Sequence, residues 1–320
     1  MRVAVAGGSG LIGRALVSSL IADGHAVDVL TRNVRHASRR LPAEARLVAW
    51  DGGRDRASLV DLRDVDAVVN LCGVPVGPLP WTKRRKRTIV ESRTLPAEAL
   101  VRSIAAVAAD HRPRAYVSAS GTDWYTDLDA EPATEALVAV PRVGEAPSGP
   151  EPFLRAVCRE WEAGALRAEP LGVRVAVLRT SFVLAPGANL MRLIALPFRL
   201  WLGGPLGDGR QWFSWIHIDD VVGLYRLAIQ DDRASGPINL AAPEPCRQRD
   251  FAAAIARALG RPSWLPAPAF AIRLALRGQS TLALGSRRVV PARALELGYR
   301  FRHPEVDEAT EAAFDAPAAT

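Results

Sequence analysis

The sequence predicts an α/β fold with a doubly wound parallel sheet, followed by a smaller lobe built from separate segments of the chain. Two observations support this prediction. Over the first two thirds of the 320 residues, short apolar runs alternate with segments of helical period, a pattern typical of parallel sheets with right-handed crossovers. The first apolar run also leads directly into a glycine-rich turn and a helix.

The expected strands are short apolar runs, and the helices follow them. Arg2–Ala6 is almost uniformly apolar, as a strand covered on both faces is. Five further strands are expected at Ala26–Thr31, Ala45–Trp50, Ala67–Leu71, Arg114–Ser120 and Val173–Arg179. Helices are expected at Leu11–Ala22, at a basic stretch over Thr82–Val107, and at Phe153–Ala168.

The alternation stops after the sixth strand. Residues 185–213 are rich in Gly and Trp, and we expect them to be irregular. A helix at Asp219–Ile229 and a strand at Ile238–Leu240 then return to the sheet, and a helix at Arg249–Ala258 follows. We therefore expect residues 1–180 together with 217–242 to form one domain. The smaller lobe is expected to consist of residues 181–216 and 243–320.

Composition argues against several classes of protein. The formal net charge is +7, but the dense basic cluster at Lys83–Arg87 has no interleaved aromatic residues, so we expect no nucleic-acid partner. No apolar run reaches the roughly 18–20 residues of a membrane span, and we expect no membrane partner. The cysteines, Cys72, Cys158 and Cys246, form neither a metal-type pair nor an even disulfide set. We expect a cytoplasmic protein without a metal site.

The glycine-rich turn after the first strand predicts a dinucleotide site of the Rossmann type. Its residues are Gly7, Gly8, Ser9, Gly10, Leu11, Ile12 and Gly13. In such a turn Gly7 permits the tight bend, Gly10 lets the backbone approach a pyrophosphate, and Gly13 lets the helix pack closely on the strand. Free N–H groups and the helix dipole then attract the anion. The position of the motif between a strand and a helix supports the prediction more than the glycines alone do.

The end of the second strand distinguishes the two forms of the coenzyme. An enzyme that uses NAD places Asp or Glu here, against the ribose 2′-hydroxyl. This chain has Thr31 and Arg32, and an arginine would pair with the 2′-phosphate of NADP(H). Such a charged hydrogen bond is worth about 1.5–3 kcal/mol, so we predict NADP(H). The alternative is that Arg32 is an ordinary surface arginine; Arg35, Arg39 and Arg40 follow and could share its role.

Together with these motifs, several later segments resemble the atypical extended short-chain dehydrogenases/reductases known as the epimerase family. These segments are Asn70–Gly73, Ser118–Ser120, Trp124–Tyr125, Cys158–Glu162, Leu202–Gly204, Gly207–Gly209, Ser214–Asp220 and Asn239–Pro243. The resemblance covers nearly the whole chain. It implies an extended Rossmann fold and an NADP(H) site in which Thr31, Arg32, Leu71, Cys72 and Arg93 contact the cofactor.

The residues agree in part with what the resemblance implies. Leu71–Gly73 follow the fourth strand at its carboxyl end, where ligands bind in such sheets. We interpret Cys72 first as a small buried residue and second as a reactive thiol. Gly73 and Ser118 belong to the same expected set of cofactor contacts. Arg93 lies late on the basic helix, and it is either a phosphate clamp or a solvated charge.

Short-chain dehydrogenases usually act through a Tyr-x-x-x-Lys pair, in which the Lys lowers the Tyr pKa. Here the residues four positions after the tyrosines are Ser120, Asp129, Ile229 and His303, so the pair is missing. We expect Ser120, at the end of the fifth strand, and Tyr125, on a loop that reaches the substrate, to be catalytic. Without a nearby Lys, Tyr125 would keep a pKa near roughly 10 and act as a proton donor. The alternatives are a strand-end hydrogen bond for Ser120 and simple loop packing for Tyr125.

Two further residues have weaker interpretations. Arg179 ends the sixth strand, where it could face a cleft between the lobes and contact substrate. His217 precedes Asp219 and Asp220, which are typical of the start of a helix. We therefore interpret His217 as a contact between the lobes rather than as a general base.

The first hypothesis for function is an NADP(H)-dependent oxidoreductase of the extended family, acting on a small carbonyl, alcohol or imine compound. A second is epimerisation or dehydration of a nucleotide sugar, which the missing pair weakens because that chemistry needs a strong base. A third is a non-catalytic NADP(H) sensor or assembly factor. The expected partners are a small-molecule substrate and, as in many extended members, a second copy in a homodimer.

Overall fold

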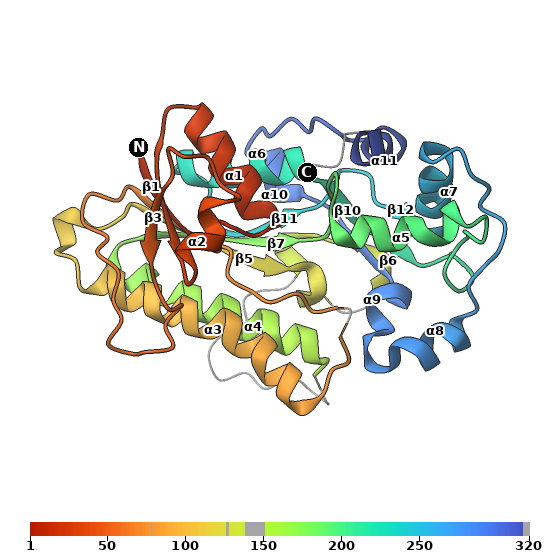
Figure 1. Ribbon diagram of the computed structural model, residues 1–320, viewed down its shortest axis with the longest axis horizontal. Helices are drawn as coiled ribbons and strands as arrows, with labels where there is room; N and C mark the ends of the chain where they lie inside the picture. Colours follow the sequence, from red (N-terminus) through yellow and green to blue (C-terminus); the bar gives the residue numbers. More distant parts are fainter. Residues whose placement is uncertain (78, 126–127, 138–150, 316–320) are drawn as a thin grey trace.

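The protein is described by a computed structural model over residues 1–77, 79–125, 128–137 and 151–315. Within these ranges a central sheet of seven strands has the order β11-β7-β5-β4-β1-β2-β3 (Figure 1), and every neighbouring pair is parallel. Its strands are β1 (Arg2–Ala6), β2 (Ala26–Thr31), β3 (Arg46–Ala49), β4 (Ala67–Asn70), β5 (Ala115–Gly121), β7 (Arg174–Thr180) and β11 (Gly236–Leu240). The chain winds outward from β1 to one edge and from β4 to the other. The predicted doubly wound α/β fold is confirmed.

Helices cover both faces of this sheet. One face carries α1 (Leu11–Ala22) and α6 (Ile218–Gln230), and the other carries α3 (Lys83–Ala105) and α4 (Phe153–Leu166), as Figure 1 shows. The side chain of Thr82 caps α3 by accepting the Arg85 N–H at 3.1 Å. The helix then continues through Pro96, which is buried. Among the residues that the structure describes, no helix is both long and apolar enough to cross a membrane.

Short elements connect the main ones. They are α2 (Val34–Ser38) and five 3-10 turns at Ala109–His111, Thr122–Trp124, Glu135–Leu137, Glu169–Leu171 and Arg277–Gln279. In the described part of the chain, three two-stranded sheets lie outside the central one. They are parallel β10 (Trp215–His217) with β8 (Phe182–Leu184), antiparallel β12 (Cys246–Arg247) with β9 (Trp212–Phe213), and parallel β13 (Arg287–Val289) with β6 (Leu128–Ala133). Apart from β6, these strands have only two or three residues and are too short to be predicted from a periodic pattern.

The segment at residues 185–213 is not irregular throughout, and that expectation is wrong. It contains α5 (Asn189–Arg199), whose buried side carries Met191, Ala195 and Phe198. The buried residues recur at helical spacing, but Pro197 inside the helix and the neighbouring glycines suggest a loop in the sequence. The remaining helices are α7 (Gln248–Ala258), α8 (Ala269–Leu276), α9 (Thr281–Leu284), α10 (Ala292–Glu296) and α11 (Val306–Asp315).

One hydrophobic core joins the two parts expected from the sequence. Buried side chains of β1 (Val5), α1 (Leu16), α7 (Phe251) and α11 (Ala309) belong to the same cluster. The carboxyl-terminal helices are therefore packed against the nucleotide-type domain rather than around a core of their own. The lobe boundaries given above stay a prediction about how the chain is organised.

Candidate functional site

The turn after β1 has the backbone geometry that its glycines were expected to allow. Gly7 has φ +80°, and a Cβ at this residue would lie 2.8 Å from the backbone carbonyl group of Leu71. At Gly13 a Cβ would lie 2.5 Å from the carbonyl oxygen of Gly7. Any side chain at Gly13 would therefore push α1 away from the turn. Two of the three glycine roles thus follow from contacts within the chain.

The amino-terminal end of α1 is open to a ligand. Gly10 is the N-cap, no side chain caps the helix, and the first turn has no acidic residue. The N–H of Gly10 itself donates to the Gly7 carbonyl at 3.1 Å. The N–H groups of Leu11 and Ile12 follow in the first turn, where helix N–H groups have no partner within the helix. Together with the helix dipole they make an anion site beside Ser9.

Arg32 lies at the carboxyl end of β2 in a turn that its neighbours hold. The backbone N–H of Asn33 donates to Thr31 Oγ1 at 3.2 Å, and Asn33 in turn caps α2. Arg32 is exposed and makes no hydrogen bond or ion pair with any residue that the structure describes. Its positive charge acts on the Cys72 thiol, where it favours a lower pKa. Arg32 therefore faces the same edge of the sheet as the end of β4.

The end of β4 is fixed from both sides. The N–H of Leu71 donates to the carbonyl of Ala6 at 2.9 Å, and the N–H of Cys72 donates to Asn70 Oδ1 at 3.1 Å. Burial raises the pKa of the Cys72 thiol to about 12, although the charge of Arg32 opposes this shift. The thiol therefore stays protonated, as expected of a small packing residue and not of a reactive one.

Arg93 is not a solvated charge. Its side chain is buried at 9% exposure, stacks on Trp161 with 4.9 Å from Cζ to the ring centroid, and lies against Gly73. Its guanidinium donates to the carbonyls of Ile89 at 3.0 Å and Val74 at 3.2 Å. Within the described residues it has no carboxylate partner, and burial lowers its pKa. A buried cation without a counter-charge is costly, so an anion beside Gly73 would stabilise it.

Ser120 and Tyr125 belong to one buried network. Ser120 Oγ donates to Glu162 Oε1 at 2.6 Å, and the two Glu162 oxygens accept from Arg179 Nε and Nη2, both at 2.9 Å. Arg179 Nη1 donates to Tyr125 Oη at 3.1 Å, and Tyr125 Oη donates to Asn239 Oδ1 at 2.9 Å. The register of the central sheet brings these residues together, because Arg179 on β7 pairs with Ser120 on β5 and with Asn239 on β11.

This network changes the expected positions of two residues. Tyr125 was expected on a loop that reaches the substrate, but its side chain is 2% exposed and turned inward. Burial raises its pKa, so the hydroxyl stays protonated and able to donate to Asn239. Arg179 was expected to face a cleft, but it is fully buried and lies 4.2 Å over the ring of Trp124. Ser118, two residues before Ser120 on β5, is also buried.

Sequence reasoning missed Glu162 and Asn239 as members of this site. Both lie in segments that carried the family resemblance, but neither has a local feature that indicates a role. Glu162 sits on the last turn but one of α4, and it meets Arg179 only because α4 packs on β5 and β7. The sequence offered one indication of a role for Glu162: it is a glutamate on an otherwise apolar, buried face of a helix.

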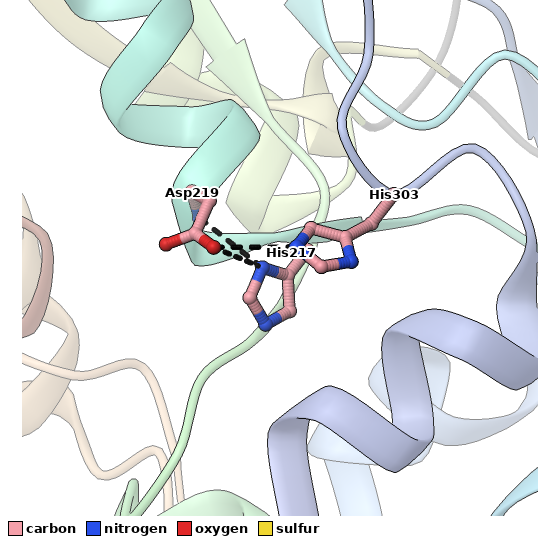
Figure 2. Close-up of side chains that lie close together, drawn as sticks. All are labelled: His217, Asp219 and His303. Carbon is pink, nitrogen blue, oxygen red and sulfur yellow. Dashed lines mark hydrogen bonds and ion pairs between the residues drawn. The ribbon is translucent and has the colours of Figure 1, made fainter. Parts of the chain in front are cut away.

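His217 joins the carboxyl-terminal segment to the sheet domain, as interpreted from the sequence. It is the N-cap of α6 and accepts the Asp219 N–H at 3.3 Å. Figure 2 shows the carboxylate of Asp219 facing both imidazole rings; its Oδ2 lies 3.5 Å from His217 Nδ1 and 3.2 Å from His303 Nε2. The two neighbouring histidines, His217 first and then His303, lower the Asp219 pKa to about 2. Neighbouring Asp220 accepts the N–H groups of Arg302 and His303.

These three side chains could also offer ligands to a metal ion. One donor atom from each of His217, Asp219 and His303 lies within 4.8 Å of the others. However, His217 Nδ1 already accepts a backbone N–H at the start of α6, where the helix dipole disfavours a cation. The cluster is explained as a joint between α6 and the segment after α10.

We expect the three thiols to resist alkylation in the folded protein. Burial raises the pKa of Cys72, Cys158 and Cys246 to about 12 each, against roughly 8.5 for free cysteine. Iodoacetamide at pH 8 should therefore react roughly a thousandfold more slowly than with free cysteine. Mass spectrometry with and without urea measures this. Fast labelling of folded Cys72 would contradict its assignment as a packing residue.

Comparisons with known proteins agree with this fold over the whole chain. The model of the NAD dependent epimerase/dehydratase family matches residues 3–241, and a domain of unknown function, DUF1731, matches residues 267–313. The epimerase family protein SDR39U1 homolog, chloroplastic, of Arabidopsis thaliana is 36% identical over 315 residues, which cover 98% of this chain and 86% of that protein. Epimerase family protein ML0860 of Mycobacterium leprae is 34% identical over 98% of this chain and 96% of its own length.

Solved structures are similar as well. The crystal structure of human epimerase family protein SDR39U1 with NADPH has a TM-score of 0.84 and 30% identity, and the match covers 98% of this chain and 99% of that one. A UDP-glucose 4-epimerase from Thermotoga maritima has a TM-score of 0.74 at 16% identity, which shows the fold alone. By the family model and by its relatives, the chain belongs to the NAD dependent epimerase/dehydratase family.

Proposed function

We propose that this protein is an NADP(H)-dependent oxidoreductase that acts on a small carbonyl, alcohol or imine compound. The observation that carries the proposal is the uncapped amino-terminal end of α1 beside Arg32, an arginine without any partner in the described chain. The helix end can hold a pyrophosphate, and Arg32 can hold a 2′-phosphate. The human relative crystallised with NADPH supports the same cofactor.

The proposed cofactor site runs along the carboxyl edge of the sheet. Gly7, Ser9, Gly10, Leu11, Ile12 and Gly13 would surround the pyrophosphate, and Thr31 with Arg32 the adenosine end. Leu71, Cys72 and Gly73 follow β4, where the rest of the cofactor would pass; Ser118 lies in the middle of β5, buried beside Asn70 at the end of β4. Arg93 is buried beside Gly73 and has no carboxylate partner in the described chain. It would pair with a negatively charged phosphate group of the cofactor.

A bound nicotinamide would supply or accept the hydride; the chain must then handle a proton. Ser120 Oγ donates to Glu162 at 2.6 Å, so it can accept a hydrogen bond from a substrate hydroxyl. We propose that Ser120 takes up that proton while passing its own to Glu162 Oε1, and that the reverse direction returns it. Tyr125 is proposed as a positioning residue: its buried hydroxyl holds Arg179, which in turn holds the Glu162 carboxylate that Ser120 contacts.

The test is nicotinamide turnover with a panel of small alcohols and carbonyls. Ser120→Ala should lower kcat by about 100-fold or more, the range of proton-transfer catalysis, and Tyr125→Phe should also lower it. The NADPH Kd should change less than about twofold in both variants, because a tenfold change would need about 1.4 kcal/mol at the cofactor. Full turnover by the double variant would refute these two roles.

The same experiment distinguishes the non-catalytic alternative. Tight NADPH binding without turnover on any carbonyl or alcohol would favour a sensor or assembly factor. Steady nicotinamide oxidation by any one compound would exclude it. In either case, the affinity for NADPH is measured separately from turnover and tests the choice of cofactor by itself.

A further inference from the structure

The smaller lobe exposes an apolar helix face that nothing in the described chain covers. Leu190, Leu193 and Leu196 on α5, and Leu200 at its C-cap, are each at least half exposed. Their spacing places them along one side of the helix, opposite the buried Met191, Ala195 and Phe198. The solvent-exposed face of a helix normally carries polar residues. Packing within this chain therefore does not explain the row of exposed leucines.

A second segment is hydrogen-bonded to the residues that follow α5 and is also apolar and exposed. Trp201 and Leu202 directly follow α5 and are more than half exposed. The Trp264 indole donates to the carbonyl of Trp201 at 2.9 Å, and the backbone N–H groups of Trp264 and Leu265 both lie 3.1 Å from the carbonyl of Gly203. The chain then enters α8, where Phe270 and Leu274 are 73% and 78% exposed, one helical turn apart. Large exposed apolar patches of this kind mark interaction sites.

The charges in these segments all have one sign. Residues 185–207 and 259–291 contain no Asp and no Glu. They contain Arg192 and Arg199 on α5, Arg273 on α8, and Arg261, whose guanidinium lies 4.8 Å from the centre of the Trp201 ring. We call the outward surface of α5, residues 201–202, residues 264–265 and α8 the apolar-basic face.

We propose that the apolar-basic face docks on the surface of an anionic lipid bilayer. Leu, Trp and Phe beside arginines, without carboxylates, are the composition of elements that lie in a membrane interface. The arginines would meet the negative headgroups while the apolar side chains enter the acyl boundary. The sequence-based expectation of no membrane partner depended on the lack of a spanning segment, and interfacial docking needs none.

A second copy of this chain fits the face less well. A two-fold contact would place the same surface of each copy against the other. Arg192, Arg199 and Arg273 of each copy would then lie against a surface that is itself basic and has no acid to pair with them. Like charges brought together in an interface disfavour that partner, whereas an anionic bilayer supplies the missing negative charge.

The test is co-sedimentation of the full chain with large vesicles. Phosphatidylcholine vesicles are compared with vesicles in which about one third of the lipid is phosphatidylglycerol, at low and high salt. We expect binding to the anionic vesicles to be at least about tenfold stronger, and to weaken in high salt. The double variant Phe270→Glu/Leu274→Glu should lose this binding by about tenfold or more.

A matched control carries the same change of charge elsewhere. Leu59→Glu/Leu295→Glu replaces two half-exposed leucines outside the face, and it should bind the anionic vesicles nearly as well as the unaltered chain. Circular dichroism melting checks that both variants fold. The proposal is overturned if the unaltered chain ignores anionic vesicles, or if both variants lose binding equally. It is also overturned if Phe270→Glu/Leu274→Glu changes only the oligomeric mass measured by light scattering, since the face then contacts a second copy.

Discussion

Replacing Arg32 with Ala is expected to raise the Kd for NADPH by about 10- to 150-fold, the equivalent of one lost charged hydrogen bond. Arg32 has no partner in the described chain, so its removal leaves no unpaired group and should not affect folding. NADH lacks the 2′-phosphate, and its Kd should change little. The Arg32→Glu variant should weaken NADPH binding further, because its carboxylate would repel the phosphate.

The control for this prediction is Arg300→Ala, which removes an exposed arginine far along the chain and should leave both affinities unchanged. Fluorescence titration of the reduced nicotinamide measures all four proteins. Equal losses of NADPH and NADH affinity in Arg32→Ala would mean that the residue supports the turn and does not recognise the phosphate. No loss at all would transfer the role to Arg35, Arg39 or Arg40.

Breaking the Arg179–Glu162 pair is expected to destabilise the fold by about 3–5 kcal/mol, the usual cost of an uncompensated buried charge. The two side chains are 0% and 1% exposed and share two hydrogen bonds. Arg179→Met would leave the Glu162 carboxylate with Ser120 as its remaining partner. The double variant Arg179→Met/Glu162→Leu should recover much of this loss, because it removes both charges together.

Urea unfolding of the single and double variants measures this coupling. The matched control is Arg63→Ala, which breaks the exposed pair with Asp61 at 2.6 Å and should leave the free energy of unfolding nearly unchanged. If Arg179→Met were as mild as this control, the network could not be what holds Ser120 and Tyr125 in place. A double variant as unstable as the sum of the two singles would show that the two charges act independently.

The sequence was most informative where local rules decide the structure. The ends of β1, α1 and β2 agree with the predicted ranges, because an unbroken apolar strand, a glycine turn and a helix each leave a strong pattern. The two- and three-residue strands β9, β10 and β12 leave none. The helix α5 was missed for a different reason: its buried residues do recur at helical spacing, but it contains Pro197 and lies in a stretch rich in Gly and Trp.

The site residues also differ in how well the sequence predicts them. The roles of Gly7 and Gly13 were predicted because backbone sterics impose them, and the position of Arg32 follows from the end of a strand. The partners of Ser120 could not be predicted, since Glu162 on α4 and Arg179 on β7 meet only after the sheet register is set. Tyr125 was placed outward because nothing in its local sequence indicates the buried hydrogen bond to Asn239.

The central claim is that the uncapped turn of α1 and Arg32 together select the phosphorylated coenzyme. Direct titration of the unaltered protein with NADPH and with NADH, by nicotinamide fluorescence in the same buffer, tests it most directly. We predict saturable NADPH binding that is at least about tenfold tighter than that of NADH. Absence of NADPH binding, or tighter binding of NADH, would contradict it.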